Sequence, residues 1–137
     1  MPKKKNTRRR PLTIEDVREI ALSMPEAWET TAWGMPTFKA GKTIFAIEPH
    51  PRPDVVPSSV GVPMSFEERA KLLEAHPDVC YLTDHWSKYP GVLVRLSSVS
   101  RADLREILAA AWHHAMERGS ASKARRKTKA RARRSRR

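Results

Sequence analysis

The sequence contains one cysteine and no long hydrophobic run, and these shortages exclude several classes of protein. Cys80 has no second cysteine with which to form an intrachain disulfide, so the chain is no disulfide scaffold and fits a reducing compartment. No stretch approaches the roughly 18 consecutive apolar residues of a membrane span. The basic N-terminal residues precede no apolar segment, so we expect no secretory signal and a cytoplasmic location, with nucleoid association as one form of it.

The motifs of common catalytic and cofactor sites are also missing. There is no glycine-rich phosphate loop, no CxxC and no HExxH. His113 and His114 are adjacent, so on a helix they point about 100° apart and cannot hold one metal ion as i, i+4 histidines do. We therefore expect no catalytic residue, no metal and no cofactor, and a protein that is not an enzyme.

Two small groups of residues offer weaker catalytic alternatives. His85 follows Asp84, whose carboxylate could orient the imidazole for proton transfer, and Cys80 with His76 or His85 would be a thiol–imidazole pair. Sequence neighbours rarely face each other, however, and a lone cysteine in the apolar segment 79–82 is typical of a small buried side chain. We interpret Asp84 as a turn residue, Cys80 as core, and His85 and Trp86 as packing over the sheet edge.

Acidic residues are missing from both ends of the chain. Residues 1–10 contain six basic residues and residues 118–137 contain eleven, with no acid in either range. Subtracting these from the 27 Lys and Arg leaves 10 basic residues against all 15 acids in residues 11–117. The net charge of +12 therefore separates into −5 for the body and +17 for the two ends.

Three segments have the capping residues and apolar spacing of helices. Thr13 with Asp16, Ser65 with Glu68, and Ser100 with Asp103 are the expected caps. The residues expected to face the core are Ile14, Val17, Ala21 and Met24 in the first helix, Phe66, Ala70 and Leu73 in the second, and Leu104, Ile107, Leu108, Ala111, Trp112 and Ala115 in the third. We expect ends at Pro25, near Ala75 and at Gly119.

The remaining apolar segments have the pattern of strands. We expect strands at residues 28–33, 37–40, 43–48, 59–62, 79–82 and 92–96, turns at 34–36 and 40–42, and a loop at the proline-rich 49–57. Val92, Val94 and Leu96 alternate with Leu93 and Arg95, as in a half-buried strand.

The order of these elements predicts the fold class. Short connections pair strands antiparallel, so we predict a two-layer α+β domain with an antiparallel sheet of about five to six strands and helices on one side, in the order α-β(3-4)-α-β(2)-α. The domain comprises residues 13–117, between a disordered basic N-terminal arm (1–12) and a disordered Lys/Arg/Ala-rich C-terminal tail (118–137).

Residue strings along the body resemble the MmcQ/YjbR family. The strings are Ala21–Pro25, Trp33–Phe38, Lys42–Ala46, Thr83–Trp86, Tyr89–Leu96, Leu104–Leu108 and Ala111-Trp112. The resemblance covers roughly residues 13–116 and neither end. It implies a CyaY-like fold and DNA binding through a double-wing arrangement of the sheet. This chain has Gly61 and Val62 where many members carry a lysine.

The charge distribution predicts a nucleic-acid partner. Lys and Arg that neutralise phosphates release counterions, which favours binding independently of base sequence. The expected DNA-binding residues are Lys3, Lys4, Lys5, Arg8, Arg9, Arg10, Lys39, Lys42, Lys88, Arg95, Lys123, Arg125, Arg126, Lys127, Lys129, Arg131, Arg133, Arg134, Arg136 and Arg137. Most of the affinity would come from the ends. The body cations, with Arg52, would form a strip along the hairpins, and Trp33, Trp86 and Tyr89 would stack or wedge.

Other interpretations of the same residues remain open. The ends could serve solubility alone, or bind RNA or polyphosphate. An acidic body with the groove of a chaperone-like fold would instead hold a protein partner, with the ends only localising it. The body cations could also be ordinary exposed charges without a binding role. We place Trp28 and Trp112 in the core.

Overall fold

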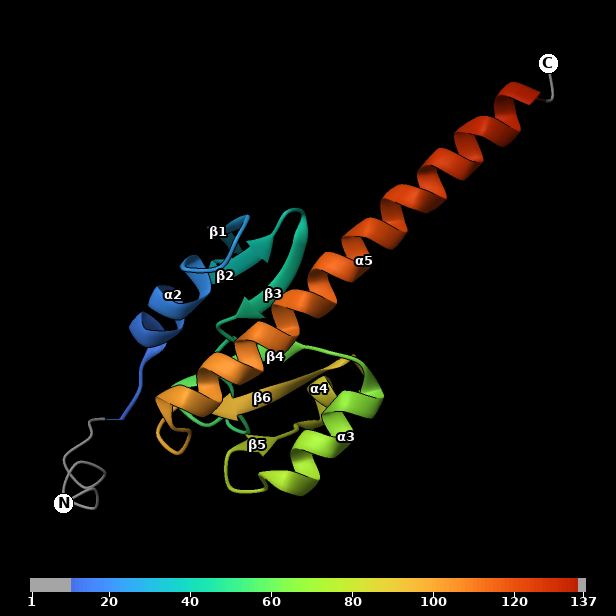
Figure 1. Cartoon of the computed structure of the whole chain (residues 1–137). Coiled ribbons are helices and arrows are strands. Elements are labelled where there is room, and N and C mark those ends of the chain that lie inside the picture. The colour runs from blue at the N-terminus through green and yellow to red at the C-terminus, as the bar shows by residue number, and fades with distance from the viewer. Residues whose placement is uncertain (1–10, 136–137) are drawn as a thin grey trace.

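The computed structural model describes the backbone of residues 11–135 and the side chains of residues 11–119 (Figure 1). The elements are α2 (Ile14–Leu22), β1 (Ala27–Ala32), β2 (Met35–Ala40), β3 (Thr43–Ile47), β4 (Ser59–Pro63), α3 (Phe66–Ala75), β5 (Cys80–Tyr81), α4 (Asp84–Ser87), β6 (Gly91–Arg95) and α5 (Arg101–Ser135). None of the helices in this part of the chain is long and apolar enough to span a membrane.

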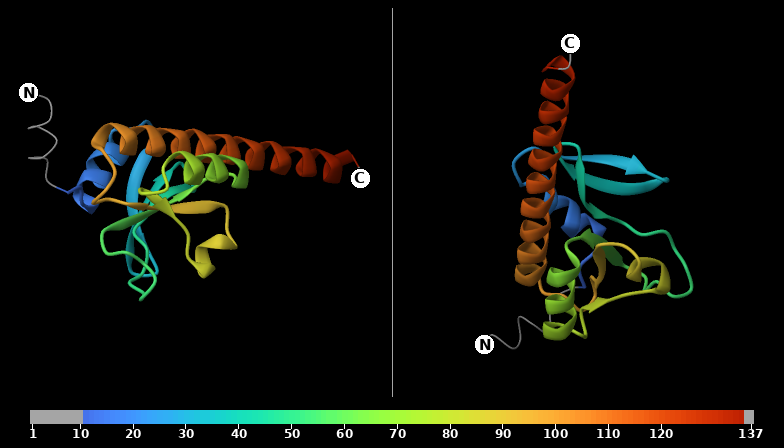
Figure 2. Two further views of the ribbon diagram at one scale, coloured as in Figure 1. Left: turned by 90° about the horizontal axis from the view of Figure 1, so that it is seen from below. Right: turned by 90° about the vertical axis from the view of Figure 1, so that its right-hand side faces the viewer.

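The six strands form one open antiparallel sheet in the order β1-β2-β3-β4-β6-β5. The long helix α5 crosses one face of the sheet, with α2 and α3 in the same layer (Figures 1 and 2). The predicted two-layer α+β fold is therefore confirmed, including the sheet and the three helices on one side. The four-residue helix α4 was not predicted, and it lies on the opposite face of the sheet (Figure 2).

The main core lies between the sheet and the helices α2 and α5. Val60 pairs with Val94, and Val62 pairs with Val92, so these four valines share the face toward α5 and are fully buried. Leu104 and Leu108 of α5 are also fully buried, as their helical spacing predicted. Each such side chain contributes about 1.5–3 kcal/mol relative to an exposed one, so this layer dominates the stability of the domain.

A second, smaller cluster covers the other face of the sheet at β4 and β6. Leu93 points away from the main core yet is fully buried, because the indole of Trp86 in α4 lies over Gly61 next to it. A Cβ atom on Gly61 would come within 2.3 Å of the Trp86 ring. β6 is therefore buried on both faces, where alternation predicted a half-buried strand.

The predicted helix caps are confirmed at all three helices. Thr13 and Asp16 form a reciprocal capping box, the Ser65 hydroxyl accepts from the Glu68 amide, and the Ser100 hydroxyl accepts from the Asp103 amide. The sequence could predict these bonds because each one joins residues that are only three positions apart in the chain.

The inward face predicted for α3 is wrong for Phe66 and Ala70 and is confirmed for Leu73. Phe66 is 52% exposed and Ala70 is exposed, whereas Leu72 and Leu73 pack against the core. The Phe66 ring instead lies against the guanidinium of Arg69, 4.6 Å from the guanidinium carbon to the ring centroid. The side of α3 that faces the core therefore contains Leu72 and Leu73 and leaves out Phe66 and Ala70.

The end predicted for α5 is also wrong. The described backbone continues as a helix through Ser135, where we predicted an end at Gly119 and a disordered tail. Glycine costs a helix about 1 kcal/mol relative to alanine, but the Ala, Lys and Arg residues beyond it favour a helix already nucleated on the body. The predicted disordered arm was too long at residue 12, because Leu12 is buried in the core. The disorder predicted for residues 1–10 and 136–137 lies outside the described residues and stays a prediction.

Candidate nucleic-acid interface

Trp28, which is exposed, and Lys39, which is half-buried, form a cross-strand pair on the face of the sheet away from α5. The two residues are directly opposite in β1 and β2, and the Lys39 ammonium lies 5.5 Å from the centroid of the Trp28 ring. The indole N–H donates to the Gly41 carbonyl oxygen at 2.6 Å. Trp28 is 45% exposed, so its predicted core position is wrong. The core assignment failed because α2 packs against the other face of β1 and β2, and Trp28 lies on the face that the helices α2 and α5 leave open.

The turn between β2 and β3 places Lys42 beside this pair. Gly41 has a φ of +62°, which L side chains rarely adopt, so glycine suits this two-residue turn. The Gly41 amide donates to the Glu26 carbonyl and fixes the turn against the start of β1. Trp28, Lys39 and Lys42 therefore gather at one end of the sheet, and we name these three residues the hairpin-end surface.

Helix α5 leaves the body next to the hairpin-end surface. The nearest atom to a Cβ built on Gly119 is the Thr43 hydroxyl at 3.7 Å, and Thr43 directly follows Lys42. Beyond this contact, α5 continues for 16 residues as a straight extension past the β2–β3 hairpin (Figures 1 and 2). Residues 120–135, which we name the α5 extension, contain eight basic residues and no acid. Their side chains lie outside the part of the chain described in full.

Lys88 and Arg95 lie apart from the hairpin-end surface. Lys88 is the exposed residue that ends α4. Arg95, on β6, has its guanidinium carbon 4.3 Å from the Tyr81 ring centroid and donates to the Asp78 carbonyl at 3.3 Å. Two strands separate β6 from β2, or about 14 Å at the usual strand spacing. Arg52 is exposed in the loop that follows β3, at the opposite end of that strand from Lys42. The fold therefore brings together two of the five cations predicted to form the strip, and the strip is not continuous.

The predicted stacking aromatics also divide. Trp33, in the turn between β1 and β2, is 75% exposed, and Tyr89 after α4 is 52% exposed. Trp86 instead packs on Gly61, so it is a structural residue. Trp112 is half-buried, packs against the core and donates its indole N–H to the Pro25 carbonyl, which confirms its predicted place.

Among the residues of the weaker catalytic alternatives, Cys80 is buried, whereas Asp84 and His85 are exposed. Cys80 is buried, as predicted, and burial raises the pKa of its thiol to about 11, an effect that the nearby Arg95 partly opposes. At neutral pH the thiol is therefore protonated and a poor nucleophile. His85 is exposed, with its ring 5.2 Å from that of Tyr89, so the predicted packing over the sheet holds for Trp86 alone. Asp84 begins α4 and is no simple turn residue.

No cluster that could hold a metal ion is found in the part of the chain that the structure describes.

This chain has Gly61 and Val62 where many members of the resembling family carry a lysine, and neighbouring side chains occupy the space around both residues. Gly61 lies beneath the Trp86 ring, and Val62 is fully buried on the α5 face. A lysine in place of either residue could not reach the surface unless the neighbouring side chains moved.

Arg69 holds the segment around α4 in place, and sequence reasoning did not find it. Its guanidinium donates to the carbonyl oxygens of Tyr89 at 2.8 Å and of Trp86, Ser87 and Gly91 at 3.3–3.4 Å. These acceptors come 17 to 22 residues later in the chain, so no local spacing signals the contact. The positions of Trp86 and Tyr89 therefore depend on α3.

These features define a small α+β domain with an open antiparallel sheet and a cationic helical extension. The chain belongs to the YjbR family, whose model matches residues 22–114. The predicted resemblance is confirmed. The match ends before the α5 extension, so the family relationship concerns the body.

Two mycobacterial relatives and one solved structure each match 74% of this chain. The uncharacterized protein Rv2570 of Mycobacterium tuberculosis and the uncharacterized protein Mb2600 of Mycobacterium bovis are each 34% identical over 110 residues, covering 74% of this chain and 76% of theirs. Among solved structures, protein DR2400 of Deinococcus radiodurans, described as a DUF419 domain, superposes with a TM-score of 0.60. It is 23% identical and covers 74% of this chain and 77% of its own, which shows the shared fold.

Proposed function

We propose that this protein binds DNA through phosphate contacts made by the α5 extension, with the hairpin-end surface as a second contact. The observation that carries the proposal is the approach of Gly119 to Thr43, because it places the start of the extension beside Lys42. The two sources of positive charge then act on one stretch of duplex. The proposal needs no catalysis and no cofactor, and a nucleic-acid partner suits a protein of the cytoplasm or nucleoid.

The α5 extension carries about one cation per 3 Å, which is more than half the linear charge density of duplex DNA. Sixteen helical residues span about 24 Å, and DNA carries one phosphate charge per roughly 1.7 Å of axis. Eight cations over this length could neutralise a large share of the phosphates that they pass. The contacts carry no base specificity, so affinity should fall steeply with salt.

The acidic body determines how the protein would approach the duplex. A body of net charge −5 is repelled by phosphates, whereas Lys39 and Lys42 offer a local exception next to the extension. Lys39 and Lys42 would contact phosphates flanking the extension, and Trp28 would lie against the sugar-phosphate backbone. Lys88 and Arg95, on other parts of the surface, would contribute little.

A mobility-shift comparison tests the proposal. Full-length protein should retard a 30-base-pair duplex at low salt, and a chain ending at Gly119 should bind far more weakly with a shallower salt dependence. Among residues 11–119, whose side chains the structure describes, every buried apolar residue lies between Leu12 and Ala115. We therefore expect the shortened chain to keep this core, and a urea-unfolding curve verifies it. Equal binding by both chains would contradict the proposal. The same assay with RNA shows whether the partner is DNA alone.

A second candidate function is a protein-interaction module. The observation that favours it is a groove between α3 and α5 lined by carboxylates. On this account the two ends only localise the protein. It predicts that nucleic-acid-free full-length protein shows no salt-dependent binding to duplex DNA or RNA, which the same assay measures.

A further inference from the structure

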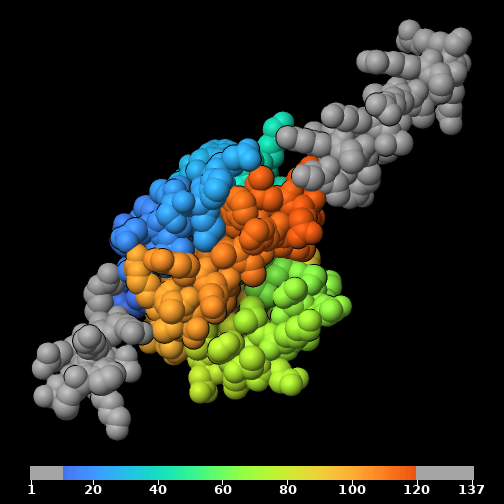
Figure 3. All heavy atoms as spheres, in the orientation of Figure 1, coloured from blue at the N-terminus to red at the C-terminus, as the bar shows by residue number. Residues whose placement is uncertain are grey.

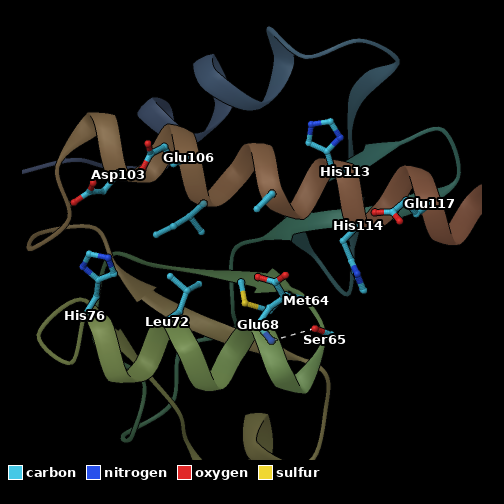
Figure 4. A pocket seen from close by; sticks show the side chains of 12 residues that line it. Met64, Ser65, Glu68, Leu72, His76, Asp103, Glu106, His113, His114 and Glu117 are labelled. Atoms are coloured by element: carbon cyan, nitrogen blue, oxygen red, sulfur yellow. Dashed lines mark hydrogen bonds between the residues drawn. The ribbon is translucent and has the colours of Figure 1, made fainter.

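A groove of about 370 Å³ runs between α3 and α5, on the helical face of the molecule. The two helices lie side by side there (Figure 3). Figure 4 shows His76 and Asp103 at one end of the groove and Ser65 and Glu117 at the other. The floor is apolar: Leu72 comes from α3, Ile107 and Ala110 from α5, and Met64 from the segment between β4 and α3.

The charged groups that line the groove are all acidic. Four carboxylates line it, namely Glu68, Asp103, Glu106 and Glu117, together with three histidines, His76, His113 and His114. No Lys or Arg is among the described residues that line it. In a chain of net charge +12, the groove is therefore a concentration of negative charge beside an apolar floor.

This combination suits a segment rich in Lys and Arg. Long basic side chains place their methylene stems on apolar surface and their charged ends at its rim. Here the stems would lie on Leu72 and Ile107, and the charged ends would meet the carboxylates. A phosphate-bearing ligand would be repelled by the same carboxylates, so the groove is not part of the nucleic-acid interface.

We propose that residues 1–10 of the N-terminal arm of the same chain occupy this groove. The arm joins the body at Leu12, which is buried and donates its amide to the Leu96 carbonyl at 3.2 Å. Leu96 precedes Arg101, the first residue of α5, by five positions. The arm therefore leaves the body close to the end of the groove formed by His76 and Asp103.

The length and charge of the arm fit the groove. Ten extended residues reach about 33 Å, whereas the groove from Asp103 to Glu117 extends about 21 Å along α5. The arm contains six basic residues for four carboxylates. Binding within one chain is favoured because a short tether keeps the arm at an effective concentration in the millimolar range.

The other cationic segment of the same chain cannot reach the groove. The α5 extension continues the axis of α5 beyond Glu117 as a helix, so it leads away from the groove (Figure 1). A consequence is that the two ends have different roles. The arm covers an acidic surface of the body, and the extension stays available to phosphates.

Paramagnetic relaxation in the full-length protein tests this proposal. A Pro2→Cys variant carries a nitroxide on the arm, and the buried Cys80 escapes labelling under mild conditions. At low salt we expect selective broadening of amide signals from residues 65–76 and 103–117. We expect the broadening to disappear at 1 M salt, where the Debye length is about 3 Å.

Matched charge variants separate the groove from general attraction to the acidic body. Glu68→Gln with Glu106→Gln and Glu117→Gln should abolish the broadening, whereas Glu48→Gln with Asp54→Asn and Glu74→Gln, all outside the groove, should leave it unchanged. Broadening that appears only on an isotope-labelled chain mixed with a spin-labelled one would assign the groove to a second copy and overturn the proposal. Uniform or absent broadening would overturn it too. Neither result bears on DNA binding by the extension.

Discussion

The guanidinium of Arg69 lies 2.8 Å from the carbonyl oxygen of Tyr89, twenty residues further along the chain. With the bonds to Trp86, Ser87 and Gly91, this contact ties α3 to the α4 segment. The segment in turn places the Trp86 indole over Gly61. One side chain therefore supports the small cluster on the face of the sheet that α5 does not cover.

Replacing Arg69 should destabilise the protein more than the replacement of a partly exposed residue usually does. We expect Arg69→Met to lower the free energy of unfolding by about 2–4 kcal/mol, since hydrogen bonds from a charged donor contribute about 1.5–3 kcal/mol each and some acceptors regain water. Arg69→Lys should recover only part, because one ammonium cannot satisfy four carbonyls. Lys71→Met on the same helix is the control, and its effect in urea unfolding should stay within about 0.5 kcal/mol. Equal effects at both positions would contradict this role.

The two glycines Gly61 and Gly119 should respond oppositely to alanine. Gly61→Ala places a methyl group inside the Trp86 ring, so we expect a loss of about 1–3 kcal/mol from overpacking. Gly119→Ala meets nothing closer than 3.7 Å within a helix, so we expect a gain of up to about 1 kcal/mol. Urea unfolding measures both. Adding Trp86→Leu to Gly61→Ala should restore part of the loss, and no restoration would argue against the predicted clash.

The ion pair of Arg18 with Glu29 should make stability depend on acid pH. The Arg18 guanidinium hydrogen-bonds the Glu29 carboxylate at 2.7 Å and lowers the pKa of that carboxyl, while burial opposes the shift. A lowered folded-state pKa contributes stability above the unfolded pKa of about 4.3, and this contribution is lost as the pH falls through the folded value. Glu29→Gln should therefore flatten the stability curve below about pH 4.5. An unchanged curve would show that the pair contributes nothing.

Cys80 should be unreactive in the native protein. Its thiol is buried, with a pKa of about 11, so a thiol reagent at pH 8 should modify it only after unfolding. Because the folded pKa exceeds the unfolded one, the stability that this group contributes is present below about pH 8.5 and is lost as the pH rises toward 11. Rapid labelling without denaturant would contradict the burial. Arg69→Met protein, if locally opened, should label faster.

The features that could be predicted from the sequence were those that depend on residues close together in the chain. Thr13, Ser65 and Ser100 were identified as caps because their partners lie three residues away. The antiparallel order followed from the short connections at Gly34 and Gly41. The first turn was predicted at residues 34–36, but it consists of Trp33 and Gly34, and Met35 and Pro36 already belong to β2.

The features that sequence missed depend on the tertiary arrangement. Trp28 was placed in the core, but α5 covers the opposite face of the sheet and leaves the indole exposed. The contacts of Arg69 join distant segments, and nothing local in the sequence signals four backbone acceptors that lie 17 to 22 residues further along the chain. The gathering of Lys39 and Lys42 with the start of the extension likewise required the packing of Gly119 on Thr43.

The salt dependence of DNA affinity tests the central proposal most directly. Lys127→Gln with Lys129→Gln and Arg131→Gln removes three cations from the α5 extension, and Arg52→Gln with Lys71→Gln and Arg105→Gln removes three exposed cations from the body. Fluorescence anisotropy across a salt series gives the slope of log K against log salt. We predict that the extension variant loses about 2.7 from the magnitude of that slope, at about 0.9 per phosphate contact, and that the body variant keeps the parental value. Equal slopes for the two variants would contradict binding through the extension.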